Sequence, residues 1–362
     1  MSTSTSTNPL QGTDTGAPAT ARTAGRLARL RSQRTARRRW VIGLLATAVL
    51  LLAVLSLCLG QTHYSPAQVW QVISGDQVPG ATFTVGELRI PRTVMALVAG
   101  LSFGLAGVTF QTMLRNPLAS PDIIGISSGA SAAAAFAIIT LSASGAVVST
   151  FAITAGLGVA LLVYMLAYKG GAAGTRLILV GIGIAAMLDS AINYLLTQAG
   201  QWDLQVALRW LTGSLNGTTW SQVIPALIAL LVLAPVLLGQ GRNLSSLQLG
   251  DDTAAGLGVR VERTRLLAII AAVGLISFAT AATGPIAFVA FLSGPIAARI
   301  IGPRGCLLLP AALVGALLVM VGDFCGQYLL PARYPVGIVT GILGAPYLIY
   351  LIIRSNRSQG AL

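Results

Sequence analysis

Charged side chains are scarce in this chain of 362 residues. Asp, Glu, Lys and Arg together make up 9% of it, whereas hydrophobic residues make up 55%. Ordinary soluble domains carry about 25% charged residues, and a soluble surface needs about 25–35% of them. A soluble globular fold is therefore excluded, and we expect an all-α integral membrane protein.

Residues that carry catalytic or metal chemistry are equally scarce. The sequence has one His, His63, and three scattered Cys residues. These residues offer neither a metal-ligand spacing nor a disulfide framework. His63 has no plausible Ser and Asp partners, and the only Lys, Lys169, follows no glycine-rich phosphate loop. We therefore expect no catalytic site, no metal site and no cofactor on this chain.

The basic residues are concentrated before the first apolar stretch. The net charge is +13, and eight of the 23 basic residues lie between Arg22 and Arg39. This placement argues against a nucleic-acid partner. Residues 1–39 show no apolar periodicity, which predicts a disordered basic cytoplasmic tail. A secretory signal peptide fits poorly, because the charged region is too long and the next apolar stretch is long enough to span a membrane.

Long charge-free stretches follow the tail. A membrane-spanning helix needs about 20 apolar residues. The stretch 123–168 is long enough for two helices, and 266–304 must hold two short ones, broken around Gly284 and Pro285. The total is about ten transmembrane helices. The charge-free stretches are Trp40–Gly75, Thr93–Leu114, Ile123–Tyr168, Leu177–Gln198, Trp210–Gly241, Leu266–Ala298, Cys306–Gly322 and Tyr334–Ile353.

The distribution of Lys and Arg predicts the orientation. Cytoplasmic loops are enriched in these residues. With the tail inside and the helices alternating, 19 of the 23 basic residues fall inside and 4 outside. Both termini are therefore expected to be cytoplasmic.

The segment from Leu88 to Ala130 has the most distinctive local pattern. Gly100 and Gly104 have a spacing that lets helices approach closely in lipid. Two prolines four residues apart then break the helix, and irregular backbone is tolerated in a membrane only beside protein or a water-filled cavity. A tight turn before a closely packed helix is the alternative to a translocation pathway. The candidate pathway residues are Gln111, Asn116, Pro117, Pro121, Gly125, Ser127, Ser128 and Gly129.

Motifs across nearly the whole chain after residue 40 occur together in a fixed order. They are Arg89–Arg92, Gly107–Gln111, Arg115–Asp122, Gly125–Ala130, Trp210–Leu215 with Trp220, Gly250–Asp252 with Ala254, Leu257 and Gly258, Gly284–Val289, and Pro335–Thr340 with Gly344–Pro346. In these motifs the sequence resembles the FecCD-type permease subunits of ABC importers for iron–siderophore complexes, haem and vitamin B12.

The resemblance implies a permease domain over residues 40–355, a coupling loop at 239–265 and a cytoplasmic tail at 356–362. It implies a multi-pass protein of the bacterial cytoplasmic membrane, surrounded by lipid, without ATPase motifs of its own. The implied partners are a second permease subunit, identical or related, two ATPase subunits that bind ATP and Mg, and an extracellular or periplasmic substrate-binding protein. Ferric siderophores are the implied substrates.

The residues of the coupling loop also predict a short helix on physical grounds. Asp251 and Asp252 would begin a short helix, where the helix dipole favours negative charge, and Gly258 can end it. From the residues alone, an ordinary solvated loop is the alternative. The resemblance implies that this helix contacts the ATPase through Asp251, Asp252, Ala254, Ala255, Leu257 and Gly258.

Three arginines expected outside have a plausible common role. Arg89 and Arg92 bracket an Ile-Pro step before a span, and Arg333 precedes the last span. Arg forms bidentate pairs with carboxylates, and the resemblance implies that these residues orient the binding protein. Snorkelling, or pairing with Glu87, is the alternative.

Two acids lie near the membrane interior. Acids inside a membrane are candidates for functional sites, so Asp189 is a possible pathway residue, although pairing within the bundle is an alternative. For Asp323 we expect a structural role. A secondary transporter, an integral-membrane enzyme, and an importer of haem or corrinoid rather than siderophore are the competing functions.

Overall fold

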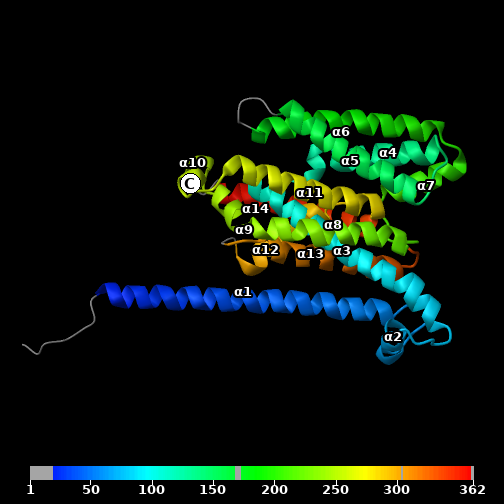
Figure 1. Cartoon of the computed structure of the whole chain (residues 1–362), viewed down its shortest axis with the longest axis horizontal. Coiled ribbons are helices and arrows are strands. Elements are labelled where there is room, and N and C mark those ends of the chain that lie inside the picture. The colour runs from blue at the N-terminus through cyan, green and yellow to red at the C-terminus, as the bar shows by residue number, and fades with distance from the viewer. Residues whose placement is uncertain (1–18, 168–172, 303–304, 360–362) are drawn as a thin grey trace, which may run out of the picture. The chain divides into compact units, whose positions relative to one another are not determined.

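The computed structural model describes residues 19–167, 173–302 and 305–359. Lys169 lies outside the described residues. The described chain is built of helices (Figure 1). They are α1 Ala19–Cys58, α2 Pro66–Ile73, η1 Thr82–Arg89, α3 Ile90–Met113, η2 Pro121–Ile124, α4 Ile126–Ile139, α5 Ala146–Ala167, α6 Ala173–Gln198, α7 Gln201–Leu211, α8 Trp220–Gly239, α9 Gly241–Leu247, α10 Asp251–Gly256, α11 Val261–Thr283, α12 Val289–Ile301, α13 Leu308–Phe324, η3 Cys325–Leu329 and α14 Val336–Gln359.

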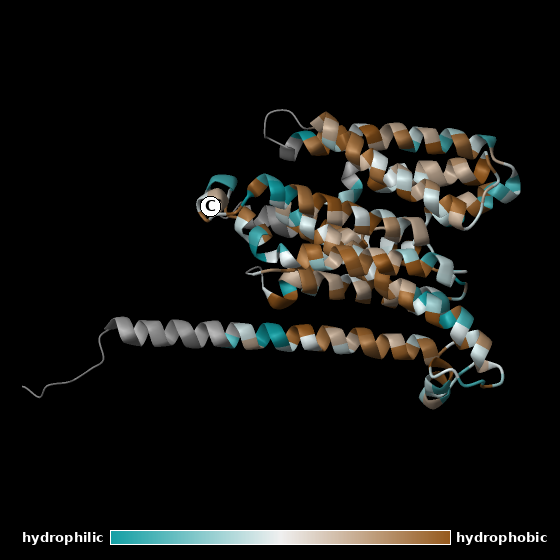
Figure 2. Ribbon diagram, viewed as in Figure 1, coloured by the Kyte–Doolittle hydropathy of each residue, from teal (hydrophilic) through white to brown (hydrophobic). Residues whose placement is uncertain are grey.

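The apolar helices confirm the expected membrane fold. Among the described residues, seven helices are long and apolar enough to cross a membrane, and three shorter apolar helices accompany them. Each of the ten expected spans corresponds to one of these helices. The apolar residues of these helices are brown in Figure 2, and polar residues gather toward the helix ends. The shorter three are Ile126–Ile139, Val289–Ile301 and Val336–Leu351.

The N-terminal segment differs from the prediction. Helix α1 begins at Ala19, although residues 1–39 were expected to lack regular structure. Ala, Leu, Gln and Arg favour helix, and residues 19–39 extend a helix that the apolar stretch already forms, so no new nucleus is needed. Residues 1–18 lie outside the described residues. The chain divides into two compact units, Met1–Val41 and Ile42–Leu362, and the site lies in the second.

Helix α3 is the centre of the second unit, where α8, α11, α12 and α13 pack against it. Its small residues make this possible. A Cβ on Gly100 would lie 2.5 Å from the Cα of Ala316, and one on Gly104 would lie 2.3 Å from the carbonyl oxygen of Ala311. The predicted close approach of helices at these glycines is therefore confirmed, with α13 as the partner.

A second group of helices is formed by α4, α5, α6 and α7. Helix α4 packs on α5, α6 and α7, and α11 contacts both α4 and α5. Helix α11 therefore joins this group to the helices around α3. A short connection, residues 140–145, separates α4 from α5.

The break between α11 and α12 falls at the predicted place. Helix α11 ends at Thr283, and α12 begins at Val289. Gly284 has φ 72°, and a Cβ there would lie 2.1 Å from the carbonyl oxygen of Trp210, so only glycine fits. The Ser214 amide donates to the Thr283 carbonyl at 2.7 Å. The unwound backbone is thus surrounded by protein, as a membrane requires.

Helix α3 has an earlier start than the sequence suggested. The segment before Thr93, where the expected charge-free stretch begins, contains the π-helix η1 (Thr82–Arg89), which runs directly into α3. Pro91 clashes with the carbonyl four residues earlier in regular α-helix, and a wider π turn before it provides room. The proline in the motif therefore lies within a continuous helix rather than at its beginning.

Candidate functional site

The expected coupling helix is present as α10. It begins with Asp251 and Asp252, Leu257 caps its C-terminus, and Gly258 follows with φ 84°. This φ lies in the left-handed region that glycine favours at helix ends. Helix α10 lies at one end of the second unit, and α7 lies at the other (Figure 1).

Asp251 fixes α10 to the two central helices. Its carboxylate accepts from Arg115, just after the end of α3, and from Nη2 of Arg265 in α11 at 2.8 and 2.9 Å. Arg115 also donates from Nε to the Leu247 carbonyl at 2.8 Å. Charge-assisted hydrogen bonds of this kind are stronger than neutral ones. These bonds join α10 to the turn after α3 and to α11.

The six predicted coupling residues divide into two groups. Ala254 is fully buried and Asp251 pairs within the chain, so these two hold α10 in place. The side of α10 that faces away from the bundle carries Leu257, which is 63% exposed. An exposed large apolar side chain in a polar loop suits a protein contact. The exposed residues of the predicted set are Asp252, Ala255, Leu257 and Gly258.

The turn after α3 places a carboxylate beside a cavity. Asp122 accepts from Ser120 Oγ at 3.0 Å and also from Ser127 Oγ. All three residues line a cavity of about 490 Å³, the Asp122 cavity, whose other walls include Phe288 and Phe291. Ser127 was predicted from the sequence, whereas Asp122 and Ser120 were missed. The signal for them was a Ser cap with an acid in the first turn of a helix.

The other predicted pathway residues are spread over different environments. Asn116 and Pro117 are exposed, and Asn116 Oδ1 accepts from the Leu118 amide at 2.9 Å in a local turn. Gly125, with φ 81°, and Pro121 are buried at η2, and Ser128 is half-buried. These five residues shape the turn but do not line the Asp122 cavity.

Two further predicted pathway residues lie at contacts between helices. Gln111 is 7% exposed and donates from Nε2 to the Phe291 carbonyl at 2.9 Å, which ties α3 to α12. A Cβ on Gly129 would lie 2.6 Å from Val159 Cγ2 of α5. Gln111 and Gly129 are therefore interior contacts between helices, because the helix interface leaves no open space at either position.

Helix α6 carries polar residues on an exposed face. Asp189 is exposed, as are its neighbours on that side, Ser190, Asn193, Tyr194 and Thr197. Asp189 and Asn193 have no hydrogen-bond partner within the described part of the chain. Polar groups are costly against lipid. This face, the α6 polar face, is thus suited to water or to another protein.

Arg89 does not have the expected exposed position. It is 8% exposed and donates to the carbonyls of Leu57 at 2.8 Å and Thr62 at 2.7 Å, while its guanidinium lies over the ring of Tyr64. No ion pair joins it to Glu87, which is exposed. The free backbone carbonyls in the last turn of α1 and just after it need donors, and Arg89 donates to Leu57 in the helix and to Thr62 beyond it. Arg89 is therefore a structural residue of this loop.

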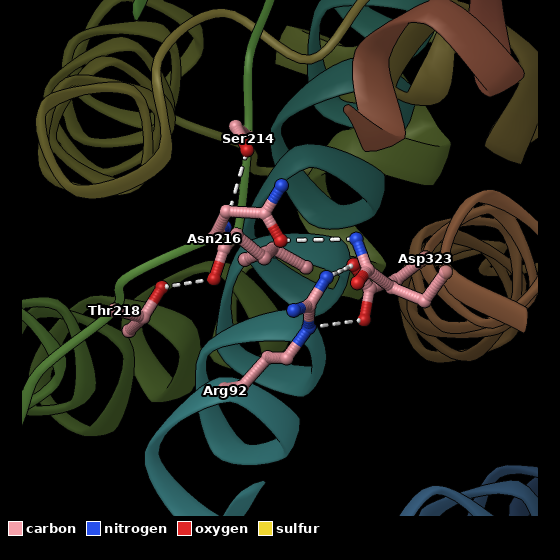
Figure 3. A network of polar contacts seen from close by, with 7 residues as sticks. Arg92, Ser214, Asn216, Thr218 and Asp323 are labelled. Carbon is pink, nitrogen blue, oxygen red and sulfur yellow. Dashed lines mark hydrogen bonds and ion pairs between the residues drawn. The ribbon is translucent and has the colours of Figure 1, made fainter. Parts of the chain in front are cut away.

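Arg92 is paired with Asp323, as Figure 3 shows. Nε lies 2.8 Å from Oδ2 and Nη2 lies 2.6 Å from Oδ1, in a bidentate pair between α3 and α13. Both side chains are largely buried, at 20% and 13% exposure. The structural role expected for Asp323 agrees with this pair, and Arg92 shares that role.

Arg333 lies in the wall of a second cavity, at the α7 end of the unit. This cavity, the arginine cavity, has a volume of about 740 Å³. Arg333 is exposed, and Arg92 and Arg209 line the same space. Arg209 is the fourth of the basic residues expected outside, and no site was predicted for it, because it is far from Arg92 and Arg333 along the chain.

Comparisons with known proteins identify the family. The model of the FecCD transport family matches residues 48–354. The ferric enterobactin transport system permease protein FepG of Escherichia coli is 40% identical over 87% of this chain and 96% of its own length. The achromobactin transport system permease protein CbrC of Dickeya dadantii is 39% identical over 87% of this chain and 91% of its own length.

A solved structure shares the fold over almost its whole length. It is described as an inward-facing conformation of a metal-chelate type ABC transporter, with a TM-score of 0.78 and 26% identity. The match covers 87% of this chain and 99% of that one. The chain is thus a multi-pass protein of the cytoplasmic membrane, and it belongs to the FecCD transport family.

Proposed function

We propose that this chain is the permease subunit of an ATP-driven importer of ferric siderophores. Its relatives FepG and CbrC are named as permeases for the siderophores enterobactin and achromobactin. The observation that carries the proposal is α10, a short helix with an exposed apolar side chain that Asp251 ties to α3 and α11. Such a helix can pass a partner's movement to the bundle.

The partners follow from the exposed surfaces. The exposed residues of α10 would contact one of two ATPase subunits, and ATP and Mg would bind there rather than on this chain. The α6 polar face would adjoin a second permease subunit, with the translocation pathway, including Asp189, between the two. In this arrangement α10 and both termini are cytoplasmic, and the α7 end faces outward.

The binding protein would dock at the α7 end. Among the three arginines first assigned to docking, Arg89 is held by backbone carbonyls and Arg92 by Asp323. Arg333 is the one that is exposed and has no ion pair within the described residues. Charge pairs at the edge of an interface mainly set association rate and register, so Arg333 is the docking arginine of the three.

The function is tested by uptake in proteoliposomes that contain the complete importer. We expect ATP-dependent uptake of radioactive iron presented as a ferric siderophore with the binding protein, and none without ATP. Cobalamin and haem serve as competing substrates in parallel assays. Uptake driven by an ion gradient without ATP would identify a secondary transporter instead, and uptake of haem or cobalamin alone would replace the proposed substrate.

Contact between α10 and the ATPase is tested at Ala255, which is exposed. The Ala255→Trp variant places a bulky ring where the partner would lie, so we expect ATPase co-purification and uptake to fall together, by about tenfold or more. Ala255→Ser is the matched control, because it adds one atom at the same position, and it should behave like the unmodified protein. Full co-purification and uptake in Ala255→Trp would show that the ATPase binds elsewhere.

A further inference from the structure

The arginine cavity is large enough for a small molecule, and its walls carry more positive than negative charge. Its volume of about 740 Å³ lies within the range of roughly 300–1,000 Å³ typical of sites for small molecules. Its walls come from segments far apart in the sequence: the start of α3, the end of α7, the loop before α8 and the start of α14. The lining residues used below are Arg92, Arg209, Thr212, Asn216, Gln327 and Arg333.

Two of the three guanidinium groups in this cavity lack a counter-ion. Asp323 neutralises Arg92 through two hydrogen bonds. Arg209 and Arg333 are exposed to the cavity and make no ion pair with any residue that the structure describes. The cavity therefore carries an excess of two positive charges. Concave sites lined by one sign of charge concentrate ligands of the opposite sign.

Neutral polar groups complete the wall beside these charges. Gln327 donates from Nε2 to the side-chain oxygen Oδ1 of Asn216 at 2.9 Å. The backbone N–H of Asn216 donates to Ser214 Oγ at 3.1 Å (Figure 3). The first bond joins the loop before α8 to η3, which follows α13, and the second lies within the loop. The polar wall is thus held in place before a ligand arrives, which lowers the entropy cost of binding.

We propose that the arginine cavity is a binding site for ferric chelates that carry net negative charge, such as tris-catecholate and hydroxycarboxylate complexes. Arg209 and Arg333 recognise the anionic oxygen donors of the chelate, and the Arg92–Asp323 pair forms the base of the site. This inference rests on the proposed function and narrows its substrates. Neutral chelates, such as tris-hydroxamate complexes, gain nothing from the two arginines.

A transported chelate fits this cavity better than an acidic side chain of a docked protein does. A carboxylate of a docked protein needs only one positive charge at the edge of the interface, as in an exposed ion pair on a surface. Here the charges lie with amide and hydroxyl groups around a volume of about 740 Å³. Many polar groups converging on one concave space are typical of small-molecule recognition. Docking through Arg333 is compatible with a chelate site in this cavity, because Arg209 also lines the cavity and is not among the three arginines assigned to docking.

The test is chelate selectivity in the reconstituted importer. The Arg209→Gln variant removes one free charge of the cavity and leaves Arg333, the docking arginine, unchanged, and the Arg209→Lys variant keeps that charge as the matched control. At low substrate concentration we expect the Gln variant to take up a ferric tris-catecholate about tenfold more slowly, with less than about a twofold change for a ferric tris-hydroxamate. The Lys variant should retain most anionic uptake, and binding-protein capture is measured in parallel.

The outcomes distinguish a failure of the anion site from a failure of the proposed function. If the unmodified importer takes up no ferric chelate at all, the proposed function fails. If it takes up both chelates and the Gln variant slows both equally or neither, the function stands and the anion site is wrong. If capture of the binding protein falls in proportion to uptake of both chelates in the Arg209→Gln variant, Arg209 serves docking and the anion site is likewise wrong.

Discussion

The Asp251→Asn variant should retain its ATPase partner and lose transport. The substitution removes the charge that Arg115 and Arg265 share, whereas the exposed residues of α10 stay unchanged. Helix α10 could then follow the ATPase without moving α3 and α11. Coupling free energies between sites are typically about 1–3 kcal/mol, so we expect a decrease in uptake of about fivefold or more. Uptake and ATPase co-purification are measured on the same membranes.

The matched control for this variant is Glu262→Gln. Glu262 is exposed in the first turn of α11 and makes no ion pair with the described residues, so the substitution removes the same charge from the same loop. We expect its uptake to stay within about twofold of the unmodified protein, because exposed charges contribute little. Unchanged uptake in Asp251→Asn, or loss of the ATPase from that variant, would show that Asp251 does not act as an internal tie.

The helical architecture could be predicted from the sequence because lipid simplifies the problem. The charge-free stretches located ten spans, including the short pair broken at Gly284 and Pro285. The part of the expected disordered tail that the structure describes, residues 19–39, lies in α1, although its composition resembles a soluble tail. Its helical structure follows from continuity with the apolar part of α1, and no local pattern reports such continuity.

The site could be predicted less fully, because side-chain partners lie far apart along the chain. Arg92 and Asp323 are 231 residues apart, and Arg115 and Asp251 are 136 apart. No local spacing reveals such pairs. Three arginines were expected to be exposed for docking. In the fold, Arg89 is a structural residue, Arg92 is paired with Asp323, and Arg333 lines the arginine cavity. The start of α10 was predicted correctly, because helix dipole and capping rules act locally.

The second large effect is expected at Gly107, in the centre of α3. A Cβ at this position would lie 1.8 Å from the carbonyl oxygen of Ala290 in α12. That oxygen belongs to the backbone and cannot rotate away, so α3 and α12 must separate in Gly107→Ala. Overpacking of a core costs about 1–3 kcal/mol and occasionally more. We expect the upper part of this range, with a lower melting temperature and less monodisperse protein after solubilisation.

Gly158→Ala provides the matched control for this substitution. Gly158 lies within α5, and a Cβ there would meet no other atom within 4 Å. Replacing an interior helical glycine by alanine favours the helix by about 1 kcal/mol, so Gly158→Ala should melt at the same temperature as the unmodified protein or higher. The two variants change the same atoms in two membrane-spanning helices and differ only in what surrounds the added methyl group. Equal melting temperatures for both would therefore contradict the close contact of α3 with α12, and with it the central position of α3 through which we expect α10 to act.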